Sequence, residues 1–127
     1  MAQARLAYVV LDTVDPEKLV PFWTELLGME VTARVADGQY VILGTPSPAS
    51  GAPALSFQRV PEGKTVKNRM HLDLEVDDLE ASTEAILAMG GSWDRETREL
   101  DGYRWRCVAD PEGNEFDIVP ADGSETD

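Results

Sequence analysis

Asn68-Arg69-Met70-His71-Leu72-Asp73-Leu74-Glu75-Val76-Asp77-Asp78-Leu79-Glu80 is the stretch that decides the fold, because it predicts a strand leading directly into a capped helix. From Met70 to Val76 apolar and polar residues alternate, which favours a β-strand with one buried face. The other face carries His71, Asp73 and Glu75, and His71 is the single histidine of the chain. This polar face is therefore the first candidate for a functional site.

A helix is predicted directly after this strand. Asp77 is a good N-cap, Glu80 three residues later completes a capping box, and Gly90-Gly91 ends the helix. Strands are then predicted at about 92–98, 103–108 and 115–119, separated by turn sequences at 101–102 and 110–114. The second half of the chain therefore has the order strand, helix and three strands.

The first half has the same predicted order. A strand at 6–11 precedes a helix at about 16–27, for which Asp15 is the N-cap, Pro16 the first residue and Gly28 the stop. Pro21 lies inside this helix and is expected to kink its first turns. Strands at 29–35, 39–43 and 54–60 follow, with a proline-rich loop at 45–53.

The two halves therefore form an internal repeat. Val14-Asp15 recurs as Val76-Asp77, and Gly28 recurs as Gly90, in both cases after 62 residues (76 − 14 and 90 − 28). Matching caps, stops and trailing strands favour a duplication over coincidence. We predict an α+β protein with a single domain at 1–120, built of two tandem βαβββ modules at about 5–60 and 68–119. An acidic, flexible tail is predicted at 121–127.

Composition narrows the classes of partner. The 127 residues include 24 acidic and 11 basic ones, which gives a formal net charge of −13. Such a charge repels nucleic acid and anionic membranes, so neither is expected as a partner. No apolar run is long enough to span a membrane or to act as a signal core, and the lone cysteine, Cys107, agrees with a reducing compartment. A cytoplasmic location and a buried, structural Cys107 thiol are therefore expected.

The doubled βαβββ pattern resembles the vicinal oxygen chelate superfamily, which includes glyoxalase I, extradiol dioxygenases, and fosfomycin and bleomycin resistance proteins. The resemblance spans Leu6 to Val119 and is carried by the segments 15–28, 71–78 and 110–117. It implies the glyoxalase/bleomycin resistance fold, in which two modules form an open, curled mixed sheet around a cleft. It also implies a homodimer.

The superfamily's metal site takes one ligand from the first strand and one from the last strand of each half. In the second half, the resemblance assigns these places to His71 and Asp117. In the first half, the same places fall at Tyr8 (or Val9) and Ser56, with Gln58 next on the same face. A catalytic zinc usually needs three strong donors, so His71 and Asp117 alone leave the metal site incomplete. No cofactor is firmly implied, and Tyr8 or Asp73 is the candidate to complete a divalent-metal site.

The sequence leads to two main functional hypotheses. The first is a glyoxalase/bleomycin-resistance-like domain that binds a small organic molecule in its cleft. Its expected ligand-binding residues are Tyr8, Ser56, Gln58, His71, Trp105 and Asp117. The alternative is a divalent-metal-dependent lyase, isomerase or dioxygenase with His71 and Asp117 as metal ligands. A structural or partner-binding module with a filled cleft is a third class. The basic cluster Lys64, Lys67 and Arg69 either binds an anionic ligand group or forms a solvated loop.

Overall fold

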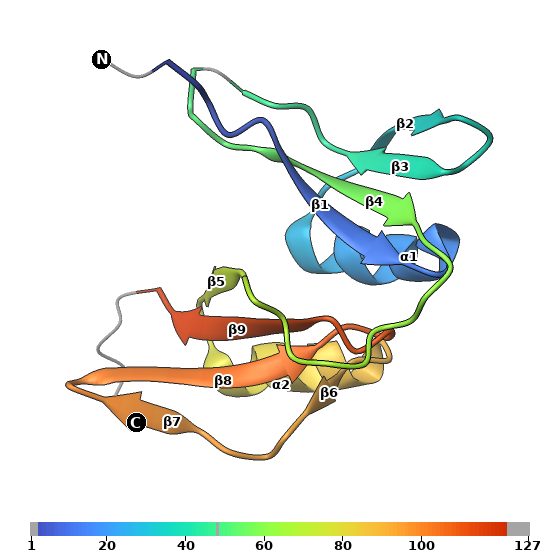
Figure 1. The fold of residues 1–127 in the computed structure, drawn as a ribbon. Helices are drawn as coiled ribbons and strands as arrows, with labels where there is room; N and C mark the ends of the chain where they lie inside the picture. Colours follow the sequence, from blue (N-terminus) through green and yellow to red (C-terminus); the bar gives the residue numbers. More distant parts are fainter. Residues whose placement is uncertain (1–2, 48, 122–127) are drawn as a thin grey trace. The chain divides into compact units, whose positions relative to one another are not determined.

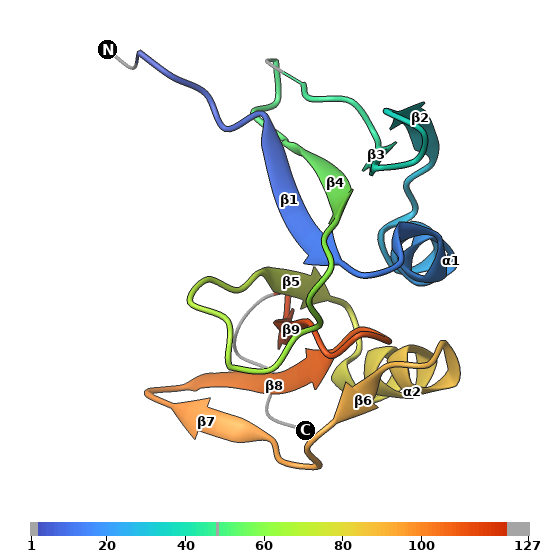
Figure 2. The same cartoon turned by 45° about the vertical axis from the view of Figure 1, so that its right-hand side comes forward.

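The computed structural model describes residues 3–47 and 49–121, so the predicted acidic tail lies outside the described residues except for Ala121. The chain divides into two compact units, Met1–Gly63 and Lys64–Asp127. Each unit contains one helix and one mixed sheet (Figures 1 and 2). The predicted α+β class is therefore confirmed. No helix in the described ranges is long and apolar enough to cross a membrane.

The first unit has a four-stranded sheet with the strand order β1-β4-β3-β2. Strands β1 and β4 are parallel, while β3 is antiparallel to both β4 and β2. The elements are β1 (Tyr8–Thr13), α1 (Pro16–Leu27), β2 (Val31–Val35), β3 (Tyr40–Leu43) and β4 (Ala54–Arg59). The predicted bounds of the first helix are confirmed, whereas its preceding strand begins and ends two residues later than predicted.

Helix α1 is held in place by a buried apolar stripe. Leu19, Phe22 and Trp23 are buried, and the helix contacts β3 and β4, where Phe57 is fully buried. The helix ends at Gly28, which has a φ of 65°, a left-handed conformation that costs glycine little. This packing leaves the opposite face of the sheet free of the helix (Figure 1).

The second unit has the strand order β5-β9-β8-β6, and β7 pairs with β8 outside this path. Strands β5 and β9 are parallel, as β1 and β4 are in the first unit. The elements are β5 (Asp73–Val76), α2 (Leu79–Ala88), β6 (Ser92–Trp93), β7 (Arg98–Leu100), β8 (Tyr103–Ala109) and β9 (Glu115–Pro120). Helix α2 packs against β6, β8 and β9.

Two predicted boundaries in the second unit were wrong. The strand begins at Asp73, where pairing with β9 starts, and not at Met70, which is 84% exposed. The helix is capped by Asp78, whose carboxylate accepts a hydrogen bond from Ala81 N at 3.0 Å, and not by Asp77.

The predicted strand at 92–98 is interrupted. It forms β6 and β7 with a loop between them, because Arg95 adopts a φ of 72° and the Asp94 carboxylate accepts a hydrogen bond from Glu96 N. Both short strands still pair with β8.

The repeat can now be aligned on its helices. The N-caps Asp15 and Asp78 lie 63 residues apart (78 − 15), one more than the sequence match suggested. This offset matches Tyr8, rather than Val9, with His71, and it matches Val10 with Asp73. Val10 pairs with Ser56 across β1 and β4, just as Asp73 pairs with Asp117 across β5 and β9. Ser56 is therefore the counterpart of Asp117.

The helix side of the second sheet contains a charged residue. Arg106 is only 4% exposed, and its guanidinium donates to Thr83 Oγ1 and Thr97 Oγ1 at 2.9 Å each and to the Glu80 carboxylate. It also lies 4.3 Å from the centre of the Trp93 ring. These contacts satisfy a cation that would be costly to bury alone.

Candidate functional site

The second sheet bears a groove of about 930 Å³. Along β9 the buried Phe116 and Ile118 alternate with Glu115, Asp117 and Val119, and the latter three line the groove. Alternation along a strand therefore separates an apolar side, which packs with the helix, from a side available for a ligand. Every groove-lining residue belongs to the second unit.

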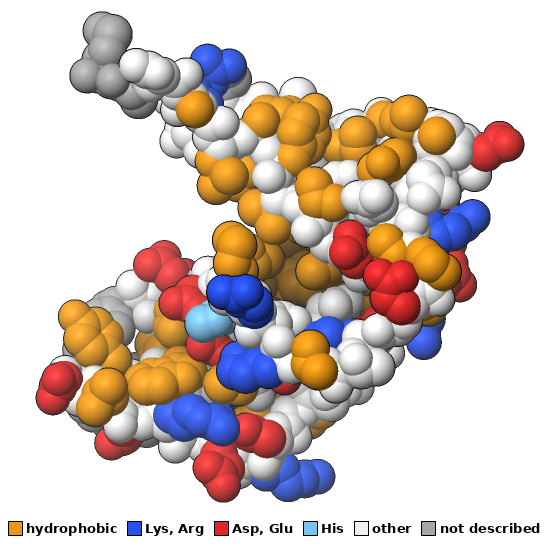
Figure 3. Space-filling model, in the orientation of Figure 1, with side chains coloured by type: hydrophobic (Ala, Val, Ile, Leu, Met, Phe, Trp, Pro, Cys, Tyr) orange, Lys and Arg blue, Asp and Glu red, His pale blue; other side chains and the backbone are white. Residues whose placement is uncertain are grey.

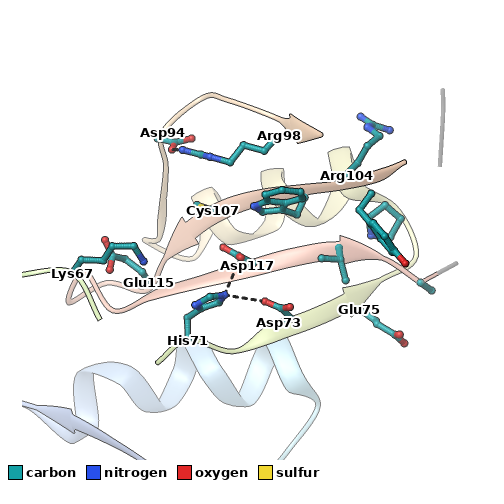
Figure 4. A pocket seen from close by; sticks show the side chains of 15 residues that line it. Lys67, His71, Asp73, Glu75, Asp94, Arg98, Arg104, Cys107, Glu115 and Asp117 are labelled. Carbon is teal, nitrogen blue, oxygen red and sulfur yellow. Dashed lines mark hydrogen bonds and ion pairs between the residues drawn. The ribbon is translucent and has the colours of Figure 1, made fainter. Parts of the chain in front are cut away.

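His71 and two carboxylates form a cluster at one edge of this groove. His71 Nε2 lies 3.2 Å from Asp117 Oδ2 and 3.3 Å from Asp73 Oδ1 (Figure 4). The register explains this arrangement, because Asp73 and Asp117 are directly paired on the parallel strands β5 and β9. One imidazole nitrogen thus faces two acids, and ligand atoms of all three residues lie within 4.8 Å of one another.

The members of the cluster differ in exposure. The side chain of Asp117 is 15% exposed, whereas those of His71 and Asp73 are 44% and 61% exposed. Figure 3 shows the histidine at the molecular surface with acidic side chains beside it. Asp117 therefore lies mostly inside the wall of the groove, whereas His71 and Asp73 are accessible to a solute from water.

The centre of the groove is aromatic and apolar. Trp105 and Cys107 project from β8, and Val119 and Pro120 come from β9. Cys107 is half-buried, and desolvation, together with a hydrogen bond to the Asp117 carboxylate, raises the pKa of its thiol to about 11. The thiol is therefore protonated at neutral pH and acts as a polarisable wall, not as a nucleophile. The expectation of a buried Cys107 was wrong, because the residue is only half-buried.

An arginine borders the groove opposite the histidine cluster. Arg98 on β7 pairs with Trp105 on β8, and its side chain extends past Cys107 toward Asp94 (Figure 4). Arg98 Nη2 donates to Asp94 Oδ2 at 2.6 Å, which holds the pKa of the Asp94 carboxyl below its ordinary value. One edge of the groove therefore carries an arginine–aspartate ion pair, and the other carries a histidine with two carboxylates.

The predicted basic cluster is divided between two roles. Lys64 Nζ lies 3.4 Å from Glu115 Oε1 and donates to the Val66 carbonyl, so it fastens its own loop. Asn68 N donates to the same Glu115 carboxylate, and this hydrogen bond lowers the pKa of the Glu115 carboxyl. Lys67 lines the groove, whereas Arg69 is exposed and does not.

The first-unit candidates lie on the corresponding strands. Tyr8 on β1 is 46% exposed, Ser56 on β4 is 5% exposed, and Gln58 on β4 is half-buried. Tyr8, Ser56 and Gln58 fall on one face of the first sheet, because the register pairs Val10 with Ser56 and residues two apart share a face. Their role in ligand binding stays a prediction.

The structure thus brings together His71, Trp105 and Asp117 of the six predicted residues. Sequence reasoning missed Arg98, Tyr103 and Val119 as groove residues, and it named Asp73 only as an auxiliary acid. The alternation around His71 was a usable signal for Asp73, since both lie on the same predicted strand face. No comparable signal was available for Arg98, because its position depends on the interrupted segment between β6 and β7.

Comparisons of this sequence and structure with known proteins point to one family. The sequence model of the glyoxalase-like domain matches residues 8–119. A curated relative from Vibrio parahaemolyticus serotype O3:K6, named "Probable lactoylglutathione lyase", is 27% identical over 130 residues. That alignment covers 94% of this chain and 92% of the relative.

Solved structures show the same fold. A glyoxalase/bleomycin resistance protein/dioxygenase family enzyme from Burkholderia phytofirmans PsJN has a TM-score of 0.74 at 20% identity, covering 93% of this chain and 99% of its own. The fosfomycin resistance protein FosX from Listeria monocytogenes also has a TM-score of 0.74, at 16% identity, covering 94% of this chain and 92% of its own. At these identities the likeness concerns the fold.

Proposed function

Because the chain belongs to the glyoxalase-like domain family, we propose that it binds a small organic molecule in the groove of its second unit. The observation that supports this proposal is that one groove combines an apolar part with a polar part. Trp105 and Val119 form the apolar part, and the cluster of His71, Asp73 and Asp117 forms the polar part. Small-molecule sites typically have volumes of about 300–1,000 Å³ and combine apolar walls with a few convergent polar groups. The groove has both properties.

The residues take distinct roles in this proposal. Trp105 provides a flat surface for the apolar part of the ligand. Asp117 and Asp73 accept hydrogen bonds from hydroxyl or amine groups of the ligand. His71, whose Nε2 lies beside both carboxylates, holds them in position. A homodimer stays a prediction, which light scattering on the purified protein checks.

Substitution of Trp105 tests the binding proposal. A fragment library is screened by ¹H–¹⁵N NMR, and dissociation constants are measured for the hits. We expect Trp105→Ala to weaken the hits at least tenfold, about 1.4 kcal/mol. Leu100→Ala is the matched control, since Leu100 is 64% exposed and does not line the groove. Hits that bind the Trp105→Ala variant with wild-type affinity would refute the assignment.

The histidine cluster favours a second candidate function, a divalent-metal-dependent lyase, isomerase or dioxygenase. The donor set fits a divalent ion, because one imidazole nitrogen and two carboxylates are the ligand types that zinc, manganese and iron(II) accept. Asp73 supplies the third donor that the first-strand and last-strand pattern lacks. A bound metal would act as a Lewis acid on vicinal oxygens of the substrate. His71, Asp73 and Asp117 would hold it.

Metal analysis distinguishes the two candidates. Protein purified without chelators is titrated with zinc, manganese and iron(II) and followed calorimetrically. The metal-dependent function requires one tightly bound ion per chain, lost in His71→Ala and Asp73→Asn but kept in Glu75→Gln. Glu75 is the matched control, because it lies two residues from Asp73 on the same strand and also lines the groove. Absence of binding by wild-type protein leaves the metal-free binding function.

A further inference from the structure

We propose that Arg98 binds a carboxylate of the ligand, so that the ligand is an organic acid whose apolar part lies over Trp105. This inference rests on the proposed binding function and specifies its substrate class. It starts from the arginine's position. Arg98 and Trp105 are directly paired on β7 and β8, and both line the groove. Figure 4 shows the Arg98 side chain on the side of the groove away from His71, with its guanidinium directed toward Asp94.

The hydrogen bonding of Arg98 leaves one donor unused. Nη2 binds Asp94, but Nη1 is buried and has no hydrogen-bond partner within the described part of the chain. A buried N–H without an acceptor is destabilising, so this donor needs an oxygen from protein, water or a bound molecule. The planar fork of arginine matches a carboxylate, which provides the missing acceptor.

The other cations of the groove are less suited to this role. Arg104 lies 3.5 Å from Glu99, with which it pairs across β7 and β8 on the opposite strand face from Arg98. Lys67 is exposed. The side chain of Arg98 is 36% exposed and lines the groove, and because its Nη1 is buried in the unliganded chain, the proposed contact requires the side chain to turn toward the ligand.

The two ends of the groove thus specify a bipolar ligand. Such a ligand has three parts. Its carboxylate binds Arg98, its aromatic or apolar part lies over Trp105, and its hydroxyl or amine binds Asp117. The acidic cluster would repel a second carboxylate at its own end, which fixes the ligand's direction.

Matched acid and amide probes test the inference. Dissociation constants are measured by NMR at pH 7 for indole-3-acetate and indole-3-acetamide, and for 3-phenylpropanoate and 3-phenylpropanamide. We expect each acid to bind wild-type protein at least tenfold more tightly than its amide. The preference should fall to about twofold or less in Arg98→Gln and be partly kept in Arg98→Lys. Arg69→Gln removes the same charge from an exposed residue outside the groove and should keep the full preference.

The outcomes separate this inference from the function on which it rests. Equal binding of acid and amide in wild-type protein, with both weakened by Trp105→Ala, would overturn the role of Arg98 and leave the binding function intact. A preference that persists in Arg98→Gln would also overturn it. Failure of all four probes to perturb resonances of groove residues would count against both. Circular dichroism of each variant establishes that it is folded.

Discussion

The two units of the chain share one plan and differ in what they place on the free face of the sheet. At three matched positions, the second unit carries His71, Asp73 and Asp117, whereas the first carries Tyr8, Val10 and Ser56. Both units join their first and last strands in parallel. The parallel pair formed by the first and last strands therefore sets the geometry of a site, and the side chains on it decide the chemistry.

The helix sides of the two sheets differ in the same sense, because the second unit again carries the charged residue. Val41 in the first unit and Arg106 in the second occupy matched positions, since they pair with Phe57 and Ile118 respectively. Val41 is fully buried among apolar residues, whereas Arg106 needs hydrogen bonds and the Trp93 ring to be buried. The first core is therefore held by apolar packing and the second partly by a polar network.

The largest expected effect tests the apolar core of the first unit. Phe57→Ala should lower the free energy of unfolding by about 3–5 kcal/mol, because it empties a fully buried position. Ile118→Ala, at the matched position, should cost about 2–5 kcal/mol. Urea denaturation followed by tryptophan fluorescence measures both. Val66→Ala, at a position 75% exposed, should change stability little. A loss below 1 kcal/mol in Phe57→Ala would contradict the assigned core.

The ends of the two helices provide the next comparison. A Cβ atom on Gly91 would lie 2.6 Å from the Ala109 carbonyl oxygen and from Ile86 Cγ2, so Gly91→Ala forces the backbone apart. We expect a loss of about 1–3 kcal/mol. Gly28 has open space around it, and Gly28→Ala meets only the cost of its positive φ, about 1 kcal/mol. Thermal denaturation of both variants tests this order. Equal losses would show that crowding at Gly91 is relieved at little cost.

The boundaries of helices and strands were predicted from the sequence where local backbone preferences set them. The first helix was predicted with its observed bounds, because Pro16 and Gly28 fix its ends through local backbone preferences. The start of β5 was not, because pairing with a distant strand sets it. The sequence favoured Asp77 as the N-cap through a capping box with Glu80, whereas Asp78 is the N-cap and Glu80 binds Arg106 instead.

The candidate site was predicted in part for the same reason. His71 and Asp117 were matched through the family resemblance, and alternation placed Asp73 beside His71. Their separation, and the fact that one nitrogen faces both acids, depends on the register of β5 and β9. Arg98 joins the groove because β7 pairs with β8 across the Asp101-Gly102 turn. The sequence indicated this turn, but it did not indicate that the preceding strand is interrupted at Arg95.

Cys107 gives a smaller, pH-dependent effect in the second unit. Its pKa is about 11 in the folded protein against 9.0 for the ordinary thiol, so the unfolded chain releases this proton first as the pH rises. Stability should therefore fall between pH 9 and 11, by at most about 2.7 kcal/mol from this group. Cys107→Ser should remove that part of the slope in urea titrations. Asp117→Ser, which copies Ser56, should lower the thiol pKa measured by thiolate absorbance near 240 nm.

The smallest effects concern the matched glutamates in the first turns of the helices. Glu17 is bound by Arg34 at 2.7 Å on the surface, and Glu80 is bound by the buried Arg106. Glu80→Gln should cost about 1 kcal/mol, because it weakens a partner of a buried cation, and Glu17→Gln should cost less, because water screens an exposed pair. Arg34 holds the pKa of Glu17 below its ordinary value of 4.5.

The sign of the pH dependence follows from that lowered pKa. The contribution of Glu17 is present above pH 4.5 and disappears as the pH falls through the folded-state pKa, because the carboxylate is then protonated in both states. Wild-type protein and Glu17→Gln should therefore differ in stability at pH 7 and converge at low pH. Raising the salt concentration should also remove the difference. If Glu17→Gln costs more than Glu80→Gln, the assignment of the polar network to the second unit is wrong, and the exposed pair of the first unit would then be the stronger contact between helix and sheet.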